Sequence, residues 1–297
     1  MKYVLTGSIG HISKPIAQQL IEAGHEVAII TSNEKNTEEI KKLGATALVG
    51  SIEDIDFLSS SFAGADAVYL MIPPKWSVTD WYAYQQEVAN NYVAAIQKNQ
   101  VQKVAVLSSI GTHMGKGAGP IDGLAYLELK LNEVSDIQAV YLRPSYFFYN
   151  FFSMIPLIQN AGFMGSNMPA DHTLVLTHTA DIADVASQYL LEDKFNGKEV
   201  VYISSDVKLI SEITATLGES IGKSDLAWVQ FTDEQSLGGM LQAGLPETIA
   251  NGYTTMGSAI SSKELEADYW KNEDKVAKGK VSLADFAKEF AGAFGNS

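Results

Sequence analysis

The first residues of the chain carry a glycine pattern suited to holding a pyrophosphate. Residues 6–10, TGSIG, follow an apolar run and precede an amphipathic stretch. Gly7 lets the chain turn sharply out of a strand, and Gly10 lets backbone N–H groups approach a phosphate, which the positive end of the next helix attracts. The third small position is Ser13 instead of glycine. The pattern predicts a dinucleotide-binding turn, and the alternative is an ordinary strand-to-helix turn without a ligand.

A second string with chemical potential is Tyr126 and Lys130, four residues apart. The positive charge of a lysine beside a tyrosine can lower the pKa of the phenol, which can then act as a general acid. Helical geometry argues against a catalytic role, because Tyr126 lies roughly 140° and Lys130 roughly 100° from the centre of the apolar stripe of this helix. The stripe comprises Ile121, Leu124, Leu127, Leu131 and Val134. An outward-facing pair is favoured, and a catalytic pair is the alternative.

Other common catalytic arrangements are missing from the sequence. The chain has no cysteine, which excludes disulfides, thiolate metal sites and a cysteine nucleophile. No nucleophile elbow or carboxylate pair stands out. The five histidines show no metal-ligand spacing, so no metal is expected; they are His11, His25, His113, His172 and His178.

The elements that must position the glycine turn follow from alternating apolar runs and helical patterns. We expect strands at residues 2–5, 26–31, 46–49, 67–72, 103–108 and 139–142. We expect helices at residues 12–23, 37–43, 55–62, 80–98 and 121–134, with Gly24, Gly44 and Gly64 ending the first three. Strands separated by helices predict an α/β, Rossmann-type, doubly wound parallel sheet. Ligands bind such sheets at the edge where the strands end.

Beyond Arg143 and Pro144 the chain changes character. An aromatic cluster comes first, comprising Tyr146, Phe147, Phe148, Tyr149, Phe151 and Phe152. We expect a dinucleotide-binding domain over residues 1–150 and a smaller α+β lobe over residues 151–297. Segments at about 173–203 return to the main domain, as a helix at 179–191 capped by Thr179 and a strand at 199–203. Most of the cluster is predicted to be core, and part of it to line a pocket for a flat apolar molecule.

Composition and charge limit the class of protein to which the chain can belong. The 297 residues are 46% hydrophobic, enough for one large core and a smaller lobe. No apolar segment approaches the roughly 20 residues that span a bilayer, and the N-terminus lacks a signal-peptide pattern, so we expect a cytoplasmic protein that is not inserted in a membrane. A net charge of −14 opposes association with nucleic acid.

Five segments, in order along the chain, carry a family resemblance. They are residues 6–10 (TGSIG), 106–111 (VLSSIG), 142–147 (LRPSYF), 178–183 (HTADIA) and 243–246 (AGLP). Together they resemble the NmrA-like subgroup of atypical short-chain dehydrogenases, which includes quinone and dye reductases and also regulators that sense a cofactor. The resemblance spans nearly the whole chain. It implies an NAD(P)-binding protein.

The resemblance also implies which residues hold the cofactor: Gly7, Ser8, Ile9, Gly10, His11, Ile12, Thr31, Ser32, Asn33, Lys35, Ser51, Met71, Ile72, Pro73, Ser108 and Ser109. Ser32 stands where the family usually has an arginine, and Ser51 where it commonly has an aspartate near the adenine. No carboxylate ends the second strand, and Lys35 can attract a 2′-phosphate, so NADP is favoured over NAD.

The same alignment bears on catalysis. Matching Glu128 to the helix glutamate of the family puts the usual tyrosine and lysine positions at Pro120 and Leu124. Tyr126 and Lys130 then lie six residues late, which is about 240° of rotation and about 9 Å of travel along a helix. The catalytic residues therefore stay unassigned.

Substrate contacts are expected from Thr112, His113, Tyr146, Phe147 and Asn150. The resemblance implies an NAD(P)H-dependent reductase of quinone-like or other conjugated small molecules. Such acceptors can take their protons from water, so the reaction does not require a tyrosine and lysine pair in the protein. The alternative is a non-catalytic NAD(P)-binding redox sensor that acts through a protein partner.

Overall fold

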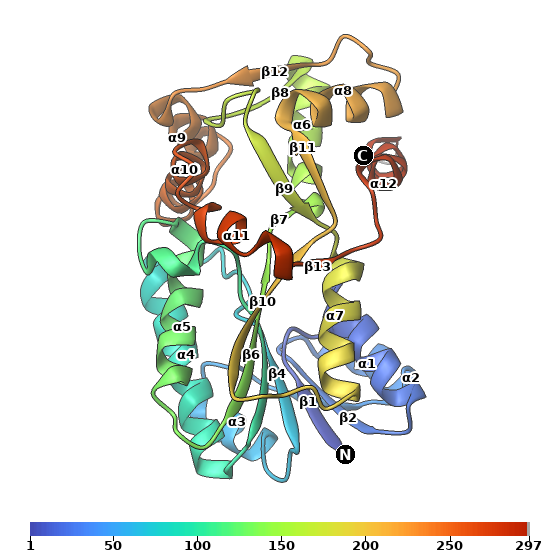
Figure 1. Ribbon diagram of the computed structural model, residues 1–297, viewed down its shortest axis with the longest axis vertical. Coiled ribbons are helices and arrows are strands. Elements are labelled where there is room, and N and C mark those ends of the chain that lie inside the picture. Colours follow the sequence, from blue (N-terminus) through green and yellow to red (C-terminus); the bar gives the residue numbers. More distant parts are fainter. Residues whose placement is uncertain (296–297) are drawn as a thin grey trace.

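An eight-stranded sheet forms the lower part of the computed structural model, which describes residues 1–295 (Figure 1). All of its strand pairs are parallel, in the order β13-β10-β6-β5-β4-β1-β2-β3. The strands are β1 (Lys2–Leu5), β2 (Glu26–Thr31), β3 (Thr46–Val49), β4 (Ala67–Leu70), β5 (Lys103–Leu107), β6 (Gln138–Pro144), β10 (Lys198–Ser204) and β13 (Ala277–Lys278). The expected doubly wound parallel sheet is confirmed.

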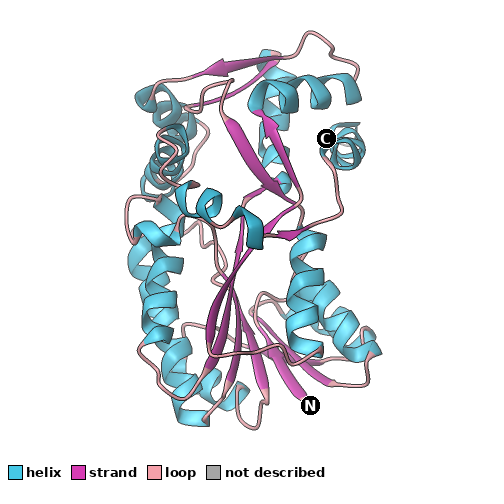
Figure 2. Ribbon diagram, viewed as in Figure 1, coloured by secondary structure: helices cyan, strands magenta, loops and turns pink. Residues whose placement is uncertain are grey.

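Helices cover both faces of this sheet (Figures 1 and 2). One face carries α1 (Ser13–Glu22), α2 (Thr37–Lys42) and α7 (Thr179–Leu191), and the other carries α3 (Ile55–Ser61), α4 (Trp81–Asn99) and α5 (Asp122–Asn132). Each helix buries one apolar stripe; in α1 that stripe is Ile16, Ala17 and Leu20. Two separate apolar layers therefore enclose the sheet.

The strand order reverses beside β1. Tyr3 pairs with Val27 of β2 on one side and with Ala67 of β4 on the other. The crossovers leaving β1 and β4 thus run to opposite sides, and ligands generally bind such sheets beyond the carboxyl ends of the strands at this point. The glycine turn at residues 6–10 lies at this point, directly after β1.

The start of α7 differs from expectation. Its N-cap is His178 and not Thr179, which already has the helical conformation. His178 has an extended backbone, and its Nδ1 atom accepts a hydrogen bond of 3.2 Å from the Ala180 N–H. An N-cap needs an extended backbone and an acceptor side chain, and the imidazole supplies that acceptor.

The second half of the chain forms the upper part, with two small sheets and several helices (Figure 2). One sheet joins β7 (Tyr146–Phe147), β9 (Thr173–Thr177) and β11 (Asp206–Leu209), and the other joins β8 (Phe163–Ser166) and β12 (Ala227–Gln230). The helices are α6 (Ile155–Ala161), α8 (Ile210–Ser220), α9 (Asp233–Gln242), α10 (Glu247–Ser261), α11 (Ala267–Lys271) and α12 (Leu283–Gly295). Short 3₁₀ segments occur at Glu34–Asn36, Thr112–Met114, Gly119–Ile121, Phe148–Met154 and Glu273–Lys275.

Segments of the second half return to the main sheet. Helix α7 packs against α1, and β10 pairs with β6 over residues 198–203. Strand β9, in contrast, belongs to a small sheet of the upper part, although it lies within the segment of about 173–203 expected to return. The proposed boundary at residue 150 stays a prediction.

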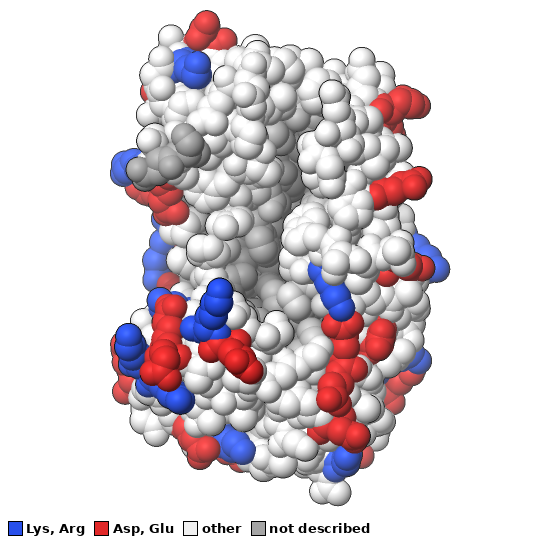
Figure 3. Space-filling model, turned by 180° about the vertical axis from the view of Figure 1, so that it is seen from behind, with Lys and Arg blue, Asp and Glu red and all other residues white. Residues whose placement is uncertain are grey.

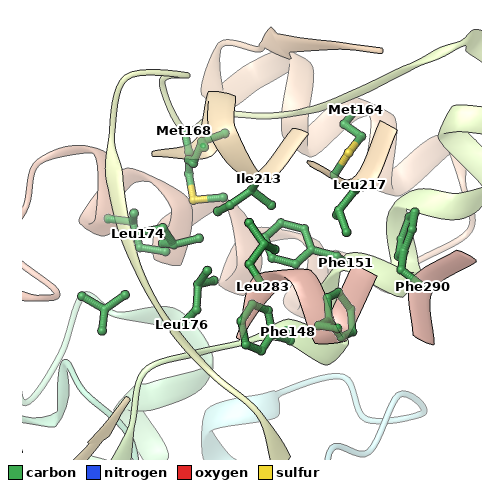
Figure 4. Packing of buried hydrophobic residues seen from close by; sticks show 14 of the residues in the cluster. Phe148, Phe151, Met164, Met168, Leu174, Leu176, Ile213, Leu217, Leu283 and Phe290 are labelled. Atoms are coloured by element: carbon green, nitrogen blue, oxygen red, sulfur yellow. The ribbon is translucent and has the colours of Figure 1, made fainter. Parts of the chain in front are cut away.

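The aromatic cluster after β6 is mostly core. Phe148 and Phe151 are fully buried, and Figure 4 shows them packed among side chains from several elements, including Leu217 of α8 and Phe290 of α12. The Phe148 ring stacks on Phe286, with centroids 4.9 Å apart. In residues 1–295 no helix is both long and apolar enough to span a membrane.

Candidate cofactor and acceptor site

The loop after β1 has a backbone that requires glycine. Gly7 has φ +87° and Ser8 has φ +56°, both in the left-handed region. A Cβ atom at Gly7 would lie 2.7 Å from Ser13 Oγ and 2.8 Å from Met71 Cγ. Ser13 also donates a hydrogen bond of 2.9 Å to the Thr6 carbonyl, so this third small position closes the turn. The close approach of α1 to β1 and β4 therefore excludes a side chain at Gly7.

Free backbone donors gather at this loop. Within residues 1–295 the N–H groups of Ile9, His11 and Ile12 donate to no other group of the chain, whereas Ser8 donates to Ile30 and Gly10 to Gly7. The three free groups immediately precede α1, whose N-terminus is a favourable place for negative charge. The loop fits the pyrophosphate of a dinucleotide.

Polar side chains meet where β2 ends. The Ser8 hydroxyl donates to Thr31 Oγ1 at 2.9 Å, and the Asn36 amide donates to Ser8 Oγ at 2.8 Å and to Thr31 Oγ1 at 3.3 Å. Thr31 is buried, so its hydroxyl ties the loop to the strand. Asn36 was not among the expected site residues, because it lies five positions beyond the strand and its contact needs the chain to turn back.

The remaining residues expected around the ribose and adenine follow β2 and β3, and their hydrogen bonds are local. Ser32, Asn33 and Lys35 are exposed, and the Asn33 side chain accepts a hydrogen bond of 3.0 Å from the Lys35 backbone. Ser51 follows β3 and accepts a hydrogen bond of 3.1 Å from the Glu53 N–H. The exposed hydroxyl, amide and ammonium groups give a 2′-phosphate three partners, and no carboxylate ends β2 to repel it.

Hydrogen bonds to backbone groups hold residues 71–73, the segment that follows β4. The Met71 N–H donates to Thr6 Oγ1 at 2.8 Å, and its carbonyl accepts from the Tyr92 hydroxyl at 2.7 Å. The Pro73 carbonyl accepts from the Tyr84 hydroxyl at 3.1 Å. These bonds fix the backbone of residues 71–73, and the Met71 side chain lies beside Gly7; the expected contact of these residues with a cofactor stays a prediction.

The two serines after β5, Ser108 and Ser109, have different surroundings. Ser108 is buried and donates its hydroxyl to Glu128 Oε1, and Thr112 donates to the Ser109 carbonyl at 3.0 Å and to Glu128 at 3.3 Å. These two hydroxyls therefore serve an internal carboxylate. Ser109 lines a pocket, and His113 is exposed on the 3₁₀ turn that follows.

Glu128 belongs to a buried charge cluster that connects the two parts of the molecule. Arg143 of β6 contacts Glu128 at 2.5 Å and Asp268 of α11 at 3.2 Å, and Tyr202 of β10 donates to Asp268. Burial by itself would lower the pKa of the Arg143 guanidinium, but the Glu128 carboxylate outweighs it and raises that pKa. Burial and the bond to Asp268 raise the pKa of Tyr202 to about 12. The cluster anchors α11 to the main sheet.

A pocket of about 170 Å³ lies between the end of β5 and the upper part. The rear face of the molecule is hollowed along its middle, and the upper walls of this hollow are mainly uncharged, whereas Lys, Arg, Asp and Glu side chains gather over the lower part, up to the lower end of the hollow (Figure 3). The pocket is lined by Ser109, Ile110, Pro120, Ile121, Ser145, Tyr146, Phe147, Asn150, Leu174, Tyr253, Met256, Ile260, Leu265 and Glu266. Of the expected substrate contacts, Tyr146, Phe147 and Asn150 line it, whereas Thr112 and His113 do not.

Tyr146 is the polar aromatic residue of this pocket that sequence reasoning identified. Burial raises the pKa of its phenol, the nearby Tyr253 phenol adds to the rise, and a hydrogen bond with Asn150 opposes it. The Tyr146 hydroxyl is therefore neutral at ordinary pH and can donate a hydrogen bond. Together with Asn150 it can orient a polar group on a molecule that is otherwise held by apolar contacts.

Tyr126 and Lys130 lie away from the pocket. The Tyr126 hydroxyl donates to Asn90 on α4 at 3.1 Å, and Lys130 pairs with Glu133 at 2.8 Å, both in exposed surroundings. Pro120, the position that the family alignment gives for the tyrosine, lines the pocket. Within residues 1–295 no group of three His, Cys, Asp or Glu side chains could hold a metal ion.

Several pocket residues had no signal in the sequence. Tyr253, Met256 and Ile260 come from α10, and Leu265 and Glu266 from the turn before α11. These segments lie more than a hundred residues from the glycine loop along the chain and reach the pocket only through the packing of the upper part. A pattern of local residues cannot identify them.

Comparison with known proteins agrees with this architecture. The structure of an NADPH-dependent quinone oxidoreductase from Escherichia coli, in complex with NADPH, is similar with a TM-score of 0.82 and 18% identity, over 97% of this chain and 99% of that one. A triphenylmethane reductase from Citrobacter sp. is similar with a TM-score of 0.81 and 17% identity, over 98% and 100%. At these identities the likeness shows the fold.

Relatives found by sequence match shorter segments. An uncharacterised protein from Schizosaccharomyces pombe is 38% identical over 68 residues, and the matched segment covers 23% of each chain. The chain thus spans less than a quarter of that relative. The model of the NmrA-like family, in contrast, matches residues 2–286, nearly the whole sequence. The resemblance noted in the sequence is thereby confirmed: the chain belongs to the NmrA-like family.

Proposed function

We propose that the chain is an NADPH-dependent reductase of quinone-like or other conjugated small molecules. The observation that carries the proposal is the mainly apolar pocket beside Ser109 and Tyr146, which opens at the same sheet edge as the free N–H groups of the glycine loop. In a doubly wound sheet, this edge is where a dinucleotide extends from its pyrophosphate toward its reactive ring. A reduced nicotinamide supplies a hydride when it is bound.

The cofactor residues are proposed from the loop outward. Ile9, His11 and Ile12 would donate their backbone N–H groups to the pyrophosphate, and the exposed Ser32 and Lys35 would face the ribose with its 2′-phosphate. The absence of a carboxylate at the end of β2 supports NADP over NAD. The NADPH bound to the similar Escherichia coli enzyme supports the same choice.

The protein's own contribution to the reaction would be positioning. Phe147 and Tyr253 give a flat acceptor apolar surfaces, and the neutral Tyr146 hydroxyl with Asn150 can hold its polar group. The Tyr126 and Lys130 pair is too remote to act as an acid. Acceptors that draw their protons from water therefore suit this site.

A spectrophotometric assay tests the proposal. Oxidation of NADPH and of NADH is followed with a panel of quinones and conjugated dyes, and each acceptor is also measured without protein. We expect NADPH to be oxidised in a protein-dependent manner with at least one acceptor. Binding of NADPH without turnover on any acceptor would refute the reductase and favour a cofactor-binding sensor.

A further inference from the structure

Among the described residues, Glu266 is the one acidic residue that lines the acceptor pocket. Glu266 stands just before α11 and is 1% exposed, and in the described chain no Lys, Arg or His is among the residues that line this pocket. A buried carboxylate is costly unless it is paired. Whether the pocket keeps a negative charge therefore depends on the groups that contact the Glu266 carboxylate.

The partners of Glu266 leave that charge in place. Its Oε2 atom lies 3.0 Å from His172 Nε2, and its Oε1 atom accepts a hydrogen bond of 3.3 Å from the Val175 N–H. The other ring nitrogen, His172 Nδ1, is buried and has no hydrogen-bond partner among residues 1–295. An imidazolium would bury an unsatisfied N–H there, whereas the neutral Nε2–H tautomer leaves only a lone pair unpaired. The geometry thus favours a neutral imidazole that donates its Nε2–H to the Glu266 carboxylate, with no cation paired to that carboxylate.

The neighbouring guanidinium does not compensate this charge. Arg143 contacts both Glu128 and Asp268, so its single positive charge already faces two carboxylates. Asp268 lies two residues after Glu266, which places this cluster near the same end of the pocket. The surroundings add negative potential to that of Glu266.

We propose that Glu266 makes the pocket selective for conjugated acceptors that carry a positive charge. This inference depends on the proposed function in one respect, namely that this pocket is where the acceptor binds. A charge in a pocket poor in water interacts with a ligand charge more strongly than it would in bulk solvent. The faces of Tyr146, Phe147 and Tyr253 also favour a cation over an anion.

Three matched naphthoquinones test the charge preference. Each carries a two-carbon side arm that ends in trimethylammonium, hydroxyl or sulfonate, so that size is nearly constant and charge varies. Affinity is measured by titration calorimetry with the chain, alone and with NADP⁺ present. We expect the cation to bind about tenfold or more tightly than the neutral compound, and the anion to bind more weakly than both.

Variants separate the pocket charge from the overall acidity of the chain. Glu266→Gln keeps an acceptor for His172 and should bring the three affinities to within about threefold of one another. Glu264→Gln removes the same charge from an exposed position two residues away, and it should retain the full preference. Thermal unfolding of each variant verifies that it is folded.

A second pocket variant covers the case in which Glu266→Gln does not fold. Met256→Lys adds a cation at a half-buried lining position and leaves Glu266 in place, and it should weaken or invert the preference. Equal affinities in the wild type, no binding of any of the three, or an unchanged preference in Glu266→Gln would overturn the proposal and leave Glu266 a structural partner of His172. Selective binding without turnover would refute the reductase alone, and turnover without charge preference would refute this inference alone.

Discussion

Arg143 and Glu128 form a buried bidentate ion pair, with Arg143 Nε 3.0 Å from Oε1 and Nη2 2.5 Å from Oε2 of Glu128. The pair joins β6 to α5 inside the molecule. Through Asp268 it also holds α11, and the turn before α11 carries Glu266 into the pocket. Stability of the fold and the shape of the pocket therefore depend on the same two residues.

Removing the cation of this pair should be strongly destabilising. Arg143→Met leaves Glu128 buried without its charge partner, and we expect the free energy of unfolding to fall by about 3–5 kcal/mol. Urea unfolding followed by circular dichroism measures this change. Lys130→Met breaks an exposed pair with Glu133, which solvent screens, and should leave the free energy of unfolding nearly unchanged. Losses of equal size in both variants would contradict the structural role of Arg143.

Tyr126 and Lys130 should be dispensable for turnover. Their side chains contact Asn90 and Glu133 at the surface of α5, so Tyr126→Phe and Lys130→Met should keep turnover within about twofold of wild type. A general acid would instead lose about 10²-fold or more when its proton donor is removed. Initial rates with the best acceptor decide between the two. A large loss in both variants would mean that the pair serves the reaction.

The glycine loop should not tolerate a side chain at the phosphate. Gly10→Val places a branched side chain among the free N–H groups of Ile9, His11 and Ile12, and it should abolish NADPH binding while the fold is kept. In this structure a Cβ at Gly10 would lie 3.3 Å from the Gly7 carbonyl oxygen, a tight contact that requires a small shift of the loop, so the fold of the variant is checked alongside its affinity. Titration calorimetry, with circular dichroism as a check, measures the effect.

The control for this variant lies on an exposed helix. Gly239→Val on α9 replaces a glycine that has no atom within 4 Å of its Cβ position, and it should leave the affinity for NADPH unchanged. Retained affinity in Gly10→Val would show that a dinucleotide, if the chain binds one, lies elsewhere.

Adding a guanidinium at the end of β2 should strengthen the preference for NADPH. Ser32 is exposed, so Ser32→Arg can offer a bidentate partner to a 2′-phosphate without disturbing the core. We expect the affinity for NADPH to rise while that for NADH stays the same, and the gain to shrink as salt is added. Equal changes for both cofactors would show that residue 32 does not face the ribose.

The sheet and its helices could be predicted because their patterns are local. Strand β2 spans Glu26–Thr31, as expected from an unbroken apolar run, and Gly24 and Gly44 follow helix ends with positive φ. The start of α7 could not be fixed, because His178 and Thr179 are adjacent acceptors and only the backbone selects between them.

The site was less predictable, since its contacts cross long stretches of chain. Ser108 was expected to face a cofactor, but its hydroxyl is taken by Glu128, twenty residues further on. Glu266 reaches His172 across 94 residues, and neither residue stands in a recognisable motif. Tyr146 and Asn150 could be identified because they follow β6 directly, at the edge where such sheets bind ligands.

An anaerobic single-turnover experiment tests the central claim most directly. The chain is saturated with NADPH, mixed rapidly with one equivalent of the best conjugated acceptor, and followed at the absorbance of NADPH and of the acceptor together. We expect both signals to decay at one rate and with equal stoichiometry, and Gly10→Val to remove the protein-dependent part. NADPH that stays bound while both absorbances remain constant, with every acceptor of the panel, would contradict it.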